Sequence, residues 1–297
     1  MFDAIIVGGG PAGLSAALLL GRARRRVLLV DAGEGRNARS HAIHGFLTRE
    51  GTPPAEFRRM AREELGRYPS IELREGVVRE ARRAEHGFTV TMEGDVLESR
   101  ALLLATGLAD ELPGWPGLDA VYGTDVWHCP YCDGYERQDE PMAVHGAGHD
   151  AVRLALEVRN WTGDLVACTD GPLGRADRRR LAALGIGLRE ERVARLRVEE
   201  GRLRALVFAD GSELPRQGLF LAIAQKPRSA LAESLGCRLT AAGQVRTDRH
   251  GATGIPGLFV AGDAAPGLQM AMVAAAQGSV AAFHLNATLL RQETRPA

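Results

Sequence analysis

The sequence has few cysteines, almost no lysine, and no excess of charge of either sign. Its 297 residues contain four cysteines, too few for a disulfide scaffold, so a conspicuous Cys pair would be catalytic or metal-binding. Thirty-seven basic residues balance 37 acidic ones, which gives no electrostatic argument for binding nucleic acid or an anionic membrane. Lys226 is the only lysine and no Gly-Lys-Ser/Thr occurs, which excludes the P-loop ATPases and GTPases.

Long apolar runs are also missing. The most apolar late stretch, 270–285, is interrupted by Gln277, Ser279 and His284, and no basic segment precedes the first apolar run. The sequence therefore predicts no membrane span and no targeting segment. We expect a cytoplasmic protein, in which cysteines stay reduced unless they take part in redox chemistry. The length allows about two domains.

The N-terminal segment predicts a strand, a tight turn, a helix and a second strand. The apolar runs 4–7 and 27–30 lack polar alternation, as in parallel strands buried on both faces. Between them stands Gly8-x-Gly10-x-x-Gly13, in which the successive glycines allow the turn, the approach of a pyrophosphate and close helix–strand packing. Asp31 ends the second strand, where an acid that binds ribose is expected. The segment predicts a dinucleotide site.

A later segment repeats this plan. Residues 142–145 predict a strand, Gly146-x-Gly148-x-x-Ala151 a turn, and 165–168 a second strand shortly before Asp170. Each plan is followed by an expected hairpin and a returning strand. The hairpins span 87–97 and 201–214. We infer an internal duplication that binds two dinucleotides, or one dinucleotide beside a degenerate twin.

Cys129 and Cys132 have two residues between them and follow a stretch rich in proline and glycine at 112–117. This spacing allows a strained disulfide with one thiol stabilised as a thiolate at a helix N-terminus. Zinc is the competing interpretation, but it needs four ligands and a second Cys-x-x-Cys is missing. Cys168 and Cys237 stand alone and have the character of small core residues. We expect a redox pair and no metal site.

In chain order, the motifs resemble the low-molecular-weight thioredoxin reductases of the pyridine nucleotide-disulfide oxidoreductase family. The residues that carry the resemblance are Gly8 to Gly13, Ala105-Thr106-Gly107, Cys129-x-x-Cys132-Asp133-Gly134, Gly146-x-Gly148-x-x-Ala151 and Gly262-Asp263. The resemblance implies an α/β fold of two Rossmann-like three-layer ββα-sandwich nucleotide-binding domains, the second inserted in the first. The FAD-binding domain is expected at 1–113 and 243–297, and an NAD(P)H-binding-like domain with the cysteines at 117–240.

The resemblance implies a bound FAD in the first domain. Gly8, Gly10 and Gly13 would hold its pyrophosphate, and Asp31 the adenosine ribose. The last helix would begin beneath the flavin pyrimidine, where the positive end of its dipole favours the anionic reduced flavin. The other residues implied at the FAD are Pro11, Ala12, Ala105, Thr106, Gly107, Gly262, Asp263, Gln269, Met270 and Ala271.

The resemblance also implies an electron path. Reduced flavin would attack the Cys129–Cys132 disulfide, with Cys132 facing the flavin and Cys129 exchanging with an outside disulfide. Asp133 would protonate the departing thiolate, provided that burial or the thiolate raises its pKa. The expected partner is a thioredoxin-like protein or a small disulfide or dithiol substrate, and a homodimer is usual in the family.

The second glycine motif departs from the family pattern. Where the family carries a His-Arg-Arg run that clamps the 2′-phosphate of NADPH, this chain reads Cys168-Thr169-Asp170. The enzyme could bind NADH, with Gly146, Gly148, Ala151 and Asp170 at its site, or NADPH through other arginines. The second domain could instead bind no nicotinamide, so that flavin takes electrons from a dithiol and passes them to oxygen, as in related FAD-dependent dithiol oxidases. A flavin redox sensor that uses the same cysteines is the non-enzymatic alternative.

Overall fold

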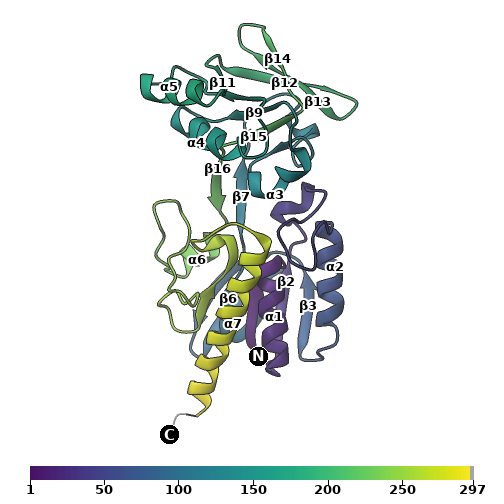
Figure 1. The fold of residues 1–297 in the computed structure, drawn as a ribbon. Helices are drawn as coiled ribbons and strands as arrows, with labels where there is room; N and C mark the ends of the chain where they lie inside the picture. The colour runs from purple at the N-terminus through teal and green to yellow at the C-terminus, as the bar shows by residue number, and fades with distance from the viewer. Residues whose placement is uncertain (295–297) are drawn as a thin grey trace. The chain divides into compact units, whose positions relative to one another are not determined.

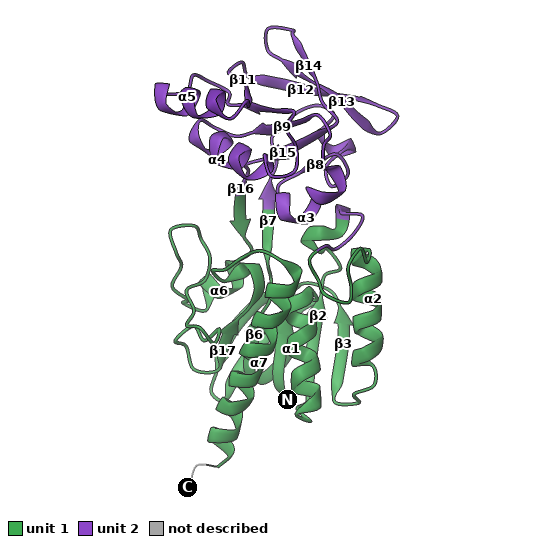
Figure 2. Cartoon of the chain, in the orientation of Figure 1, with its two compact units in different colours: residues 1–38, 45–109, 225–297 green, residues 39–44, 110–224 purple. Residues whose placement is uncertain are grey.

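The computed structural model describes residues 1–294, which form two compact units (Figure 2). Unit 1 comprises Met1–Ala38, Gly45–Ala109 and the chain from Gln225 onward, and unit 2 comprises Arg39–His44 and Asp110–Ala224. The chain passes between the units in strands β7 (Leu108–Glu111) and β16 (Ala224–Pro227), which pair as a two-stranded sheet. The sequence of unit 2 thus interrupts that of unit 1.

Unit 1 is built on a mixed sheet with the spatial order β3-β2-β1-β6-β5-β4, in which β17 also pairs with β6. Strands β3, β2, β1, β6 and β17 run parallel, whereas β4 and β5 form an antiparallel extension. The bounds are β1 (Phe2–Val7), β2 (Val27–Asp31), β3 (Ile71–Glu75), β4 (Val78–Ala84), β5 (Gly87–Met92), β6 (Asp95–Leu104) and β17 (Leu258–Val260). The central parallel strands β1 and β2 are apolar except for Asp3 and Asp31, because both of their faces are covered.

Helices α1 (Pro11–Arg22) and α7 (Ala271–Glu293) lie side by side on one face of this sheet (Figure 1). They touch through backbone at Gly278, where any side chain would collide with the carbonyl oxygen of Ala12. The other helices of unit 1 are α2 (Pro54–Leu65), α6 (Ala230–Ser234) and the 3₁₀ turn η4 (Gly262–Ala264), and the 3₁₀ turn η1 (Arg36–Arg39) leads from unit 1 into unit 2. Among residues 1–294, no helix is both long and apolar enough to cross a bilayer.

The two faces of the unit 1 sheet form two separate cores. Ile6 packs with Leu20 of α1 and Leu285 of α7, whereas Ile5 packs with the core on the opposite face. Alternate side chains of a strand point to opposite faces, so β1 has apolar residues facing both cores in its run 4–7. Residues 225–240, which the sequence places in the inserted domain, group with unit 1 because Ala232 and Leu235 belong to the core around Ile5.

Unit 2 repeats the strand–helix–strand plan on a parallel sheet with the order β11-β10-β9-β15-β8, beside an antiparallel sheet β12-β13-β14. Its strands are β8 (Val126–Trp127), β9 (Met142–His145), β10 (Leu165–Cys168), β11 (Gly187–Arg189), β12 (Val193–Glu199), β13 (Arg202–Phe208), β14 (Glu213–Pro215) and β15 (Gly218–Leu221). Its helices are α3 (Pro130–Asp133), α4 (His149–Val158) and α5 (Arg175–Ala183), with 3₁₀ turns η2 (Leu118–Ala120) and η3 (Tyr135–Arg137). The predicted α/β fold class is confirmed.

Candidate active site

The glycine turn between β1 and α1 combines two close contacts with one open position. A side chain at Gly8, whose φ is +112°, would collide with the carbonyl oxygen of Ala105, and one at Gly13 with that of Gly8. Gly10 caps α1, and no atom lies within 4 Å of the place where its Cβ would stand. The first turn of α1, which begins at Pro11, holds no acidic residue. Its N–H groups can therefore donate hydrogen bonds to the oxygens of a pyrophosphate.

Asp31 stands at the end of β2, directly beside this turn. Its Oδ2 pairs with the Arg62 guanidinium of α2 at 2.7 Å, and its Oδ1 accepts a hydrogen bond from the Gly33 N–H at 3.1 Å. A side chain at Gly9 would collide with the same carboxylate. The carboxylate is thus held next to the glycine turn, where the sequence predicts a ribose contact.

Three of the segments predicted to contact FAD meet near the start of α1. Gly8 lies against the end of β6, and Gly262, whose φ is +73°, approaches so closely that its Cβ would stand 3.0 Å from the Ala12 side chain. Thr106 donates a hydrogen bond through Oγ1 to the Arg228 carbonyl at 2.7 Å. The next residue, Gly107, accepts one from the Arg228 N–H at 3.0 Å.

Asp263 and Gln269 share a partner that the sequence did not indicate. The Arg36 guanidinium lies 3.0 Å from Asp263 Oδ2 and 2.7 Å from Gln269 Oε1. Gln269 in turn donates through Nε2 to Gln225 Oε1 at 2.7 Å. The network ends next to Met270, which caps the N-terminus of α7 ahead of Ala271.

Cys129 and Cys132 are joined by a disulfide at the start of α3. Cys129 caps the helix, and its carbonyl accepts a hydrogen bond from the Cys132 N–H at 3.1 Å. Both cysteines are half-buried, whereas Tyr131 between them is 68% exposed and sets its ring edge-on to Trp161, 5.4 Å between centroids. The disulfide therefore borders an exposed aromatic segment.

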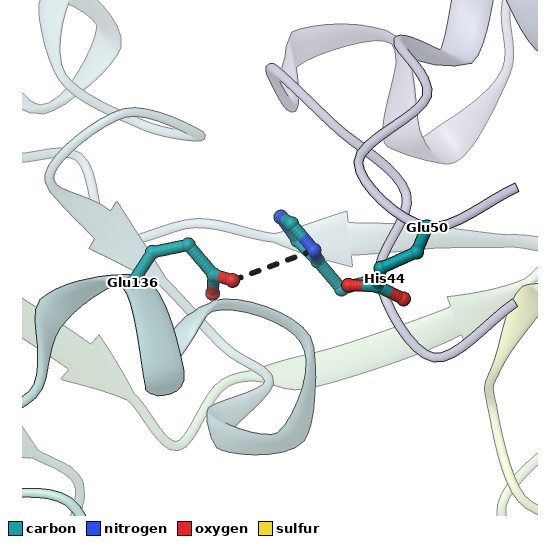
Figure 3. A group of neighbouring side chains, drawn as sticks. All are labelled: His44, Glu50 and Glu136. Atoms are coloured by element: carbon teal, nitrogen blue, oxygen red, sulfur yellow. Dashed lines mark ion pairs between the residues drawn. The ribbon is translucent and has the colours of Figure 1, made fainter.

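Asp133 directly follows Cys132 as the last residue of α3. Burial raises the pKa of this carboxyl from 3.8 to about 7, the His44 imidazole works against that rise, and the Glu136 carboxylate adds to it. His44 Nδ1 lies 3.4 Å from Glu136 Oε1, and the two side chains point toward each other in Figure 3. A carboxyl with a pKa near 7 can both hold and release a proton at neutral pH.

The glycine turn between β9 and α4 packs as closely as the turn between β1 and α1, but an acidic residue follows it. A Cβ at Gly146 would stand 2.8 Å from the Ala222 side chain and 3.0 Å from the nitrogen of Ala151, which is fully buried. Gly148, whose φ is +52°, is open like Gly10. However, Asp150 occupies the first turn of α4. Its carboxylate stabilises the helix N-terminus and repels a phosphate that approaches the same N–H groups.

Asp170, predicted to bind a ribose, is engaged within unit 2. Its Oδ1 accepts a hydrogen bond from the Val193 N–H at 2.9 Å. Its Oδ2 lies 3.0 Å from His145 Nε2, at ion-pair distance but without hydrogen-bond alignment. Burial lowers the pKa of His145, and Asp170 opposes this effect. A ribose at this carboxylate would have to compete with both partners.

Two of the arginines that follow Asp170 in the chain are also engaged. Arg178 pairs with Glu190 at 2.6 Å, and Arg189 pairs with Glu191 at 2.8 Å while its guanidinium stacks on Phe208. Arg175, the first residue of α5, is exposed.

A comparison with known protein families matches these features. The model of the pyridine nucleotide-disulphide oxidoreductase family covers residues 2–278. The chain belongs to this family. Like the family as a whole, it is an oxidoreductase, and its relatives and structural neighbours make it a thioredoxin reductase-like flavoprotein disulfide oxidoreductase.

Curated relatives differ in how much of their length the chain matches. A probable thioredoxin reductase from Arthroderma benhamiae is 38% identical over 177 residues, which are 57% of this chain and 44% of that protein. Thioredoxin reductase tcpT from Claviceps purpurea is 31% identical over 286 residues, 88% of this chain and 86% of that protein. The chain thus spans less than half of the first relative and most of the second.

Two solved structures share the fold over nearly the whole chain. The crystal structure of HlmI has a TM-score of 0.94 and 40% identity, and the match covers 98% of this chain and 93% of HlmI. A putative thioredoxin reductase TrxB from Bacillus anthracis has a TM-score of 0.94 and 32% identity, with 99% and 100% covered. These neighbours confirm the predicted pair of Rossmann-like folds.

Proposed function

We propose that the protein is an FAD-dependent thiol–disulfide oxidoreductase that moves two electrons between a reduced donor, FAD, the Cys129–Cys132 pair and an external disulfide. The observation that carries this proposal is the disulfide followed directly by Asp133, whose pKa is raised to about 7. Each thiolate that leaves during disulfide exchange needs a proton, and a carboxyl half protonated near neutral pH can supply it.

The residues of unit 1 fit a bound FAD, which supplies a two-electron store between donor and disulfide. Gly10 leaves the N-terminus of α1 open for the pyrophosphate, and Asp31 would accept a hydrogen bond from the adenosine ribose. Asp263 would bind the ribityl or phosphate region, and its pairing with Arg36 offsets its negative charge there. The N-terminus of α7, after Met270, offers the positive end of a helix dipole to an anionic flavin ring.

The cysteines would divide the exchange between them. The Cys129 thiolate attacks one sulfur of the substrate disulfide and forms a mixed disulfide, and the substrate thiolate that leaves takes a proton from Asp133. The Cys132 thiol then gives its proton to the Asp133 carboxylate and attacks Cys129 Sγ, which restores the Cys129–Cys132 bond. The second substrate thiolate released by this attack takes the proton from Asp133. Two electrons leave the pair and two substrate thiols form, so the step balances.

For the electron donor we propose NADH or NADPH at the second glycine turn. Gly146, Gly148 and Ala151 provide the strand–turn–helix geometry of a dinucleotide site. NADH would bind through Asp170, whereas NADPH would require an arginine such as the exposed Arg175.

Two observations favour the alternative, in which a dithiol replaces the nicotinamide and oxygen or another acceptor takes the electrons. Both oxygens of the Asp170 carboxylate already have neighbours in unit 2, the Val193 N–H and His145. Asp150 also sets a negative charge at the start of α4, where a pyrophosphate would bind. In that case the glycines of the second turn would be retained for their packing alone, without a bound nicotinamide.

For the substrate we propose a thioredoxin-like protein or a small disulfide or dithiol, and for the assembly a homodimer. The outer face of α7 supports a dimer, because Val280, Phe283 and Leu290 form an exposed apolar stripe. We propose the cytoplasm as the compartment, since Cys168 and Cys237 are free thiols and a reducing compartment preserves such thiols.

Titration of the purified protein tests the proposal. The flavin absorbance would be followed without oxygen during additions of NADPH, NADH or dithiothreitol. Bleaching by one nicotinamide supports the reductase and identifies its donor, whereas bleaching by dithiothreitol alone, reversed by oxygen, supports the dithiol oxidase. Protein that neither retains FAD on purification nor binds added FAD would contradict the proposal.

A further inference from the structure

A short segment from the N-terminal half of the chain belongs to unit 2. Arg39–His44 groups with this unit, although the residues on both sides of it in the chain belong to unit 1. The segment is anchored at its first residue, where the Arg39 guanidinium lies 3.2 Å from Asp119 Oδ1. Gly123 also approaches Arg39 so closely that its Cβ would stand 2.5 Å from the Arg39 carbonyl oxygen. The segment Arg39–His44 therefore has a defined place in unit 2.

The last residue of this segment, His44, meets the redox motif. Its Nδ1 lies 3.4 Å from Oε1 of Glu136, which belongs to η3 and follows Asp133 by three residues (Figure 3). His44 is mostly buried, with 18% of its side chain exposed, whereas Glu136 is partly open to solvent. Two side chains that can carry opposite charges thus lie close to each other, and one of them follows the proposed proton donor by three residues.

The two side chains act on Asp133 in opposite directions. After burial, the largest influences on the pKa of Asp133 are His44, which lowers it, and Glu136, which raises it. The imidazolium of His44 favours the ionised form of Asp133, and the carboxylate of Glu136 favours the protonated form. The pairing of His44 with Glu136 thus joins two side chains whose effects on Asp133 oppose each other.

We infer that His44 is a positioning residue for the disulfide exchange. By pairing with Glu136, His44 sets the pH range over which Asp133 gives its proton to sulfur. The inference rests on the proposed role of Asp133. In the step concerned, a dithiol thiolate attacks Cys129 Sγ, the Cys129–Cys132 bond breaks, and its electron pair stays on Cys132 Sγ. The Asp133 proton moves to that sulfur, and the dithiol is the only reductant required.

Reduction of the disulfide by dithiothreitol tests the inference in the purified holoprotein. Samples would be taken without oxygen from about pH 5 to about pH 9, quenched with iodoacetamide, and the labelled Cys132 quantified by mass spectrometry. At each pH, the rate is divided by the rate at which dithiothreitol reduces oxidised glutathione. This ratio removes the pH dependence that comes from the ionisation of dithiothreitol itself. The wild-type ratio should fall on the alkaline side as Asp133 ionises.

The variants should move this fall in opposite directions. His44→Asn removes the balancing charge, so the midpoint should rise by about half a pH unit, whereas Glu136→Gln should lower it by about as much. The double variant should lie between them, and His44→Arg, which keeps a positive charge, should not raise the midpoint. His41→Asn, an exposed histidine of the same segment, is the matched control and should change nothing.

The outcomes separate this inference from the proposed function. A merely structural role of His44 would slow the reaction at every pH without moving the midpoint, or would move it the same way in both single variants, and either result overturns the inference. If Asp133→Asn retains the alkaline fall, the proposed role of Asp133 is wrong. If Asp133→Asn abolishes the fall while His44→Asn and Glu136→Gln leave it in place, only the role of His44 is wrong.

Discussion

At the scale of single residues, the chemistry of this protein depends on how each polar side chain is buried and paired. Asp133, Asp31 and Asp170 all stand at or just after the end of a strand or short helix, yet their surroundings differ. Burial raises the pKa of Asp133, Arg62 pairs with Asp31, and His145 and a backbone N–H occupy Asp170. Residue type alone therefore does not distinguish a proton donor from a ribose contact or a structural carboxylate.

Asp133→Asn should lower the rate of exchange with external disulfides by about 100-fold, because the amide cannot protonate a thiolate. It should also change stability. The carboxyl pKa is raised in the folded state, so the wild type loses stability as pH rises from about 4 through about 7, and the variant does not. Thermal unfolding at pH 8 should thus show a higher Tm for the variant, with no difference near pH 4. Asp139→Asn, at an exposed neighbouring position, should leave rate and Tm unchanged.

Cys132→Ser should block transfer to external disulfides and leave flavin reduction by the electron donor intact. Cys132 is the thiol proposed to receive electrons, and Cys129 alone cannot resolve a mixed disulfide. Anaerobic flavin bleaching and a colorimetric disulfide assay measure the two half-reactions separately. Cys237→Ser removes a half-buried thiol outside the pair and serves as control. Persistent transfer in Cys132→Ser would show that the cysteine roles are misassigned.

The sequence named the cysteines and Asp133 but missed Arg36 and His44. The cysteine spacing is a local pattern, so one stretch of chain reveals it. Arg36 and His44 lie in the irregular segment between β2 and α2, where no periodicity marks a position. They acquire partners only through the fold, Arg36 with Asp263 and His44 with Glu136, and such pairs are separated by about 90 residues or more.

At the scale of elements, the strand–helix–strand repeats could be predicted because their signals are local. The apolar strands β1 and β9 and the glycine turns that follow them combine burial and turn geometry within a few residues. By contrast, α6 was expected in the inserted domain. Its five residues give no strong periodicity, and only the packing of Ala232 and Leu235 shows where it belongs.

At the contact between α1 and α7, helix propensity and steric collision predict opposite changes in stability for the same substitution. Helix propensity alone would make Gly278→Ala stabilising by about 1 kcal/mol. The added methyl would collide with the Ala12 backbone, which cannot rotate away, so we expect destabilisation by about 2 kcal/mol instead. Urea unfolding measures the change, and Ala276→Ser on the exposed face of α7 is the control. A more stable Gly278→Ala protein would contradict the close approach.

At the scale of the whole molecule, basic and acidic residues are equal in number, so we expect two copies of the chain to associate through apolar contacts. Phe283 is 63% exposed on α7 and forms a stripe with Val280 and Leu290. We therefore place the interface of the proposed homodimer at this stripe.

Phe283→Glu should convert the proposed homodimer to a monomer, because a charge in an apolar interface costs more than the contact returns. Analytical ultracentrifugation would show the change in mass. Val96→Glu, at an exposed apolar residue of β6, should leave the mass unchanged. A dimer that survives Phe283→Glu would place the interface elsewhere.

The order of segments in the chain also fixes the order in which the protein can be completed during synthesis. Strand β17 and helix α7, which pair with β6 and cover α1, leave the ribosome only after all of unit 2 has been made. Unit 2 can therefore fold first, while the apolar face of α1 stays uncovered. The glycine turn proposed to hold FAD gains its neighbour Gly278 only at the end of translation. Cofactor retention would thus report on completeness, since a prematurely terminated chain keeps the redox cysteines but not the packed nucleotide turn.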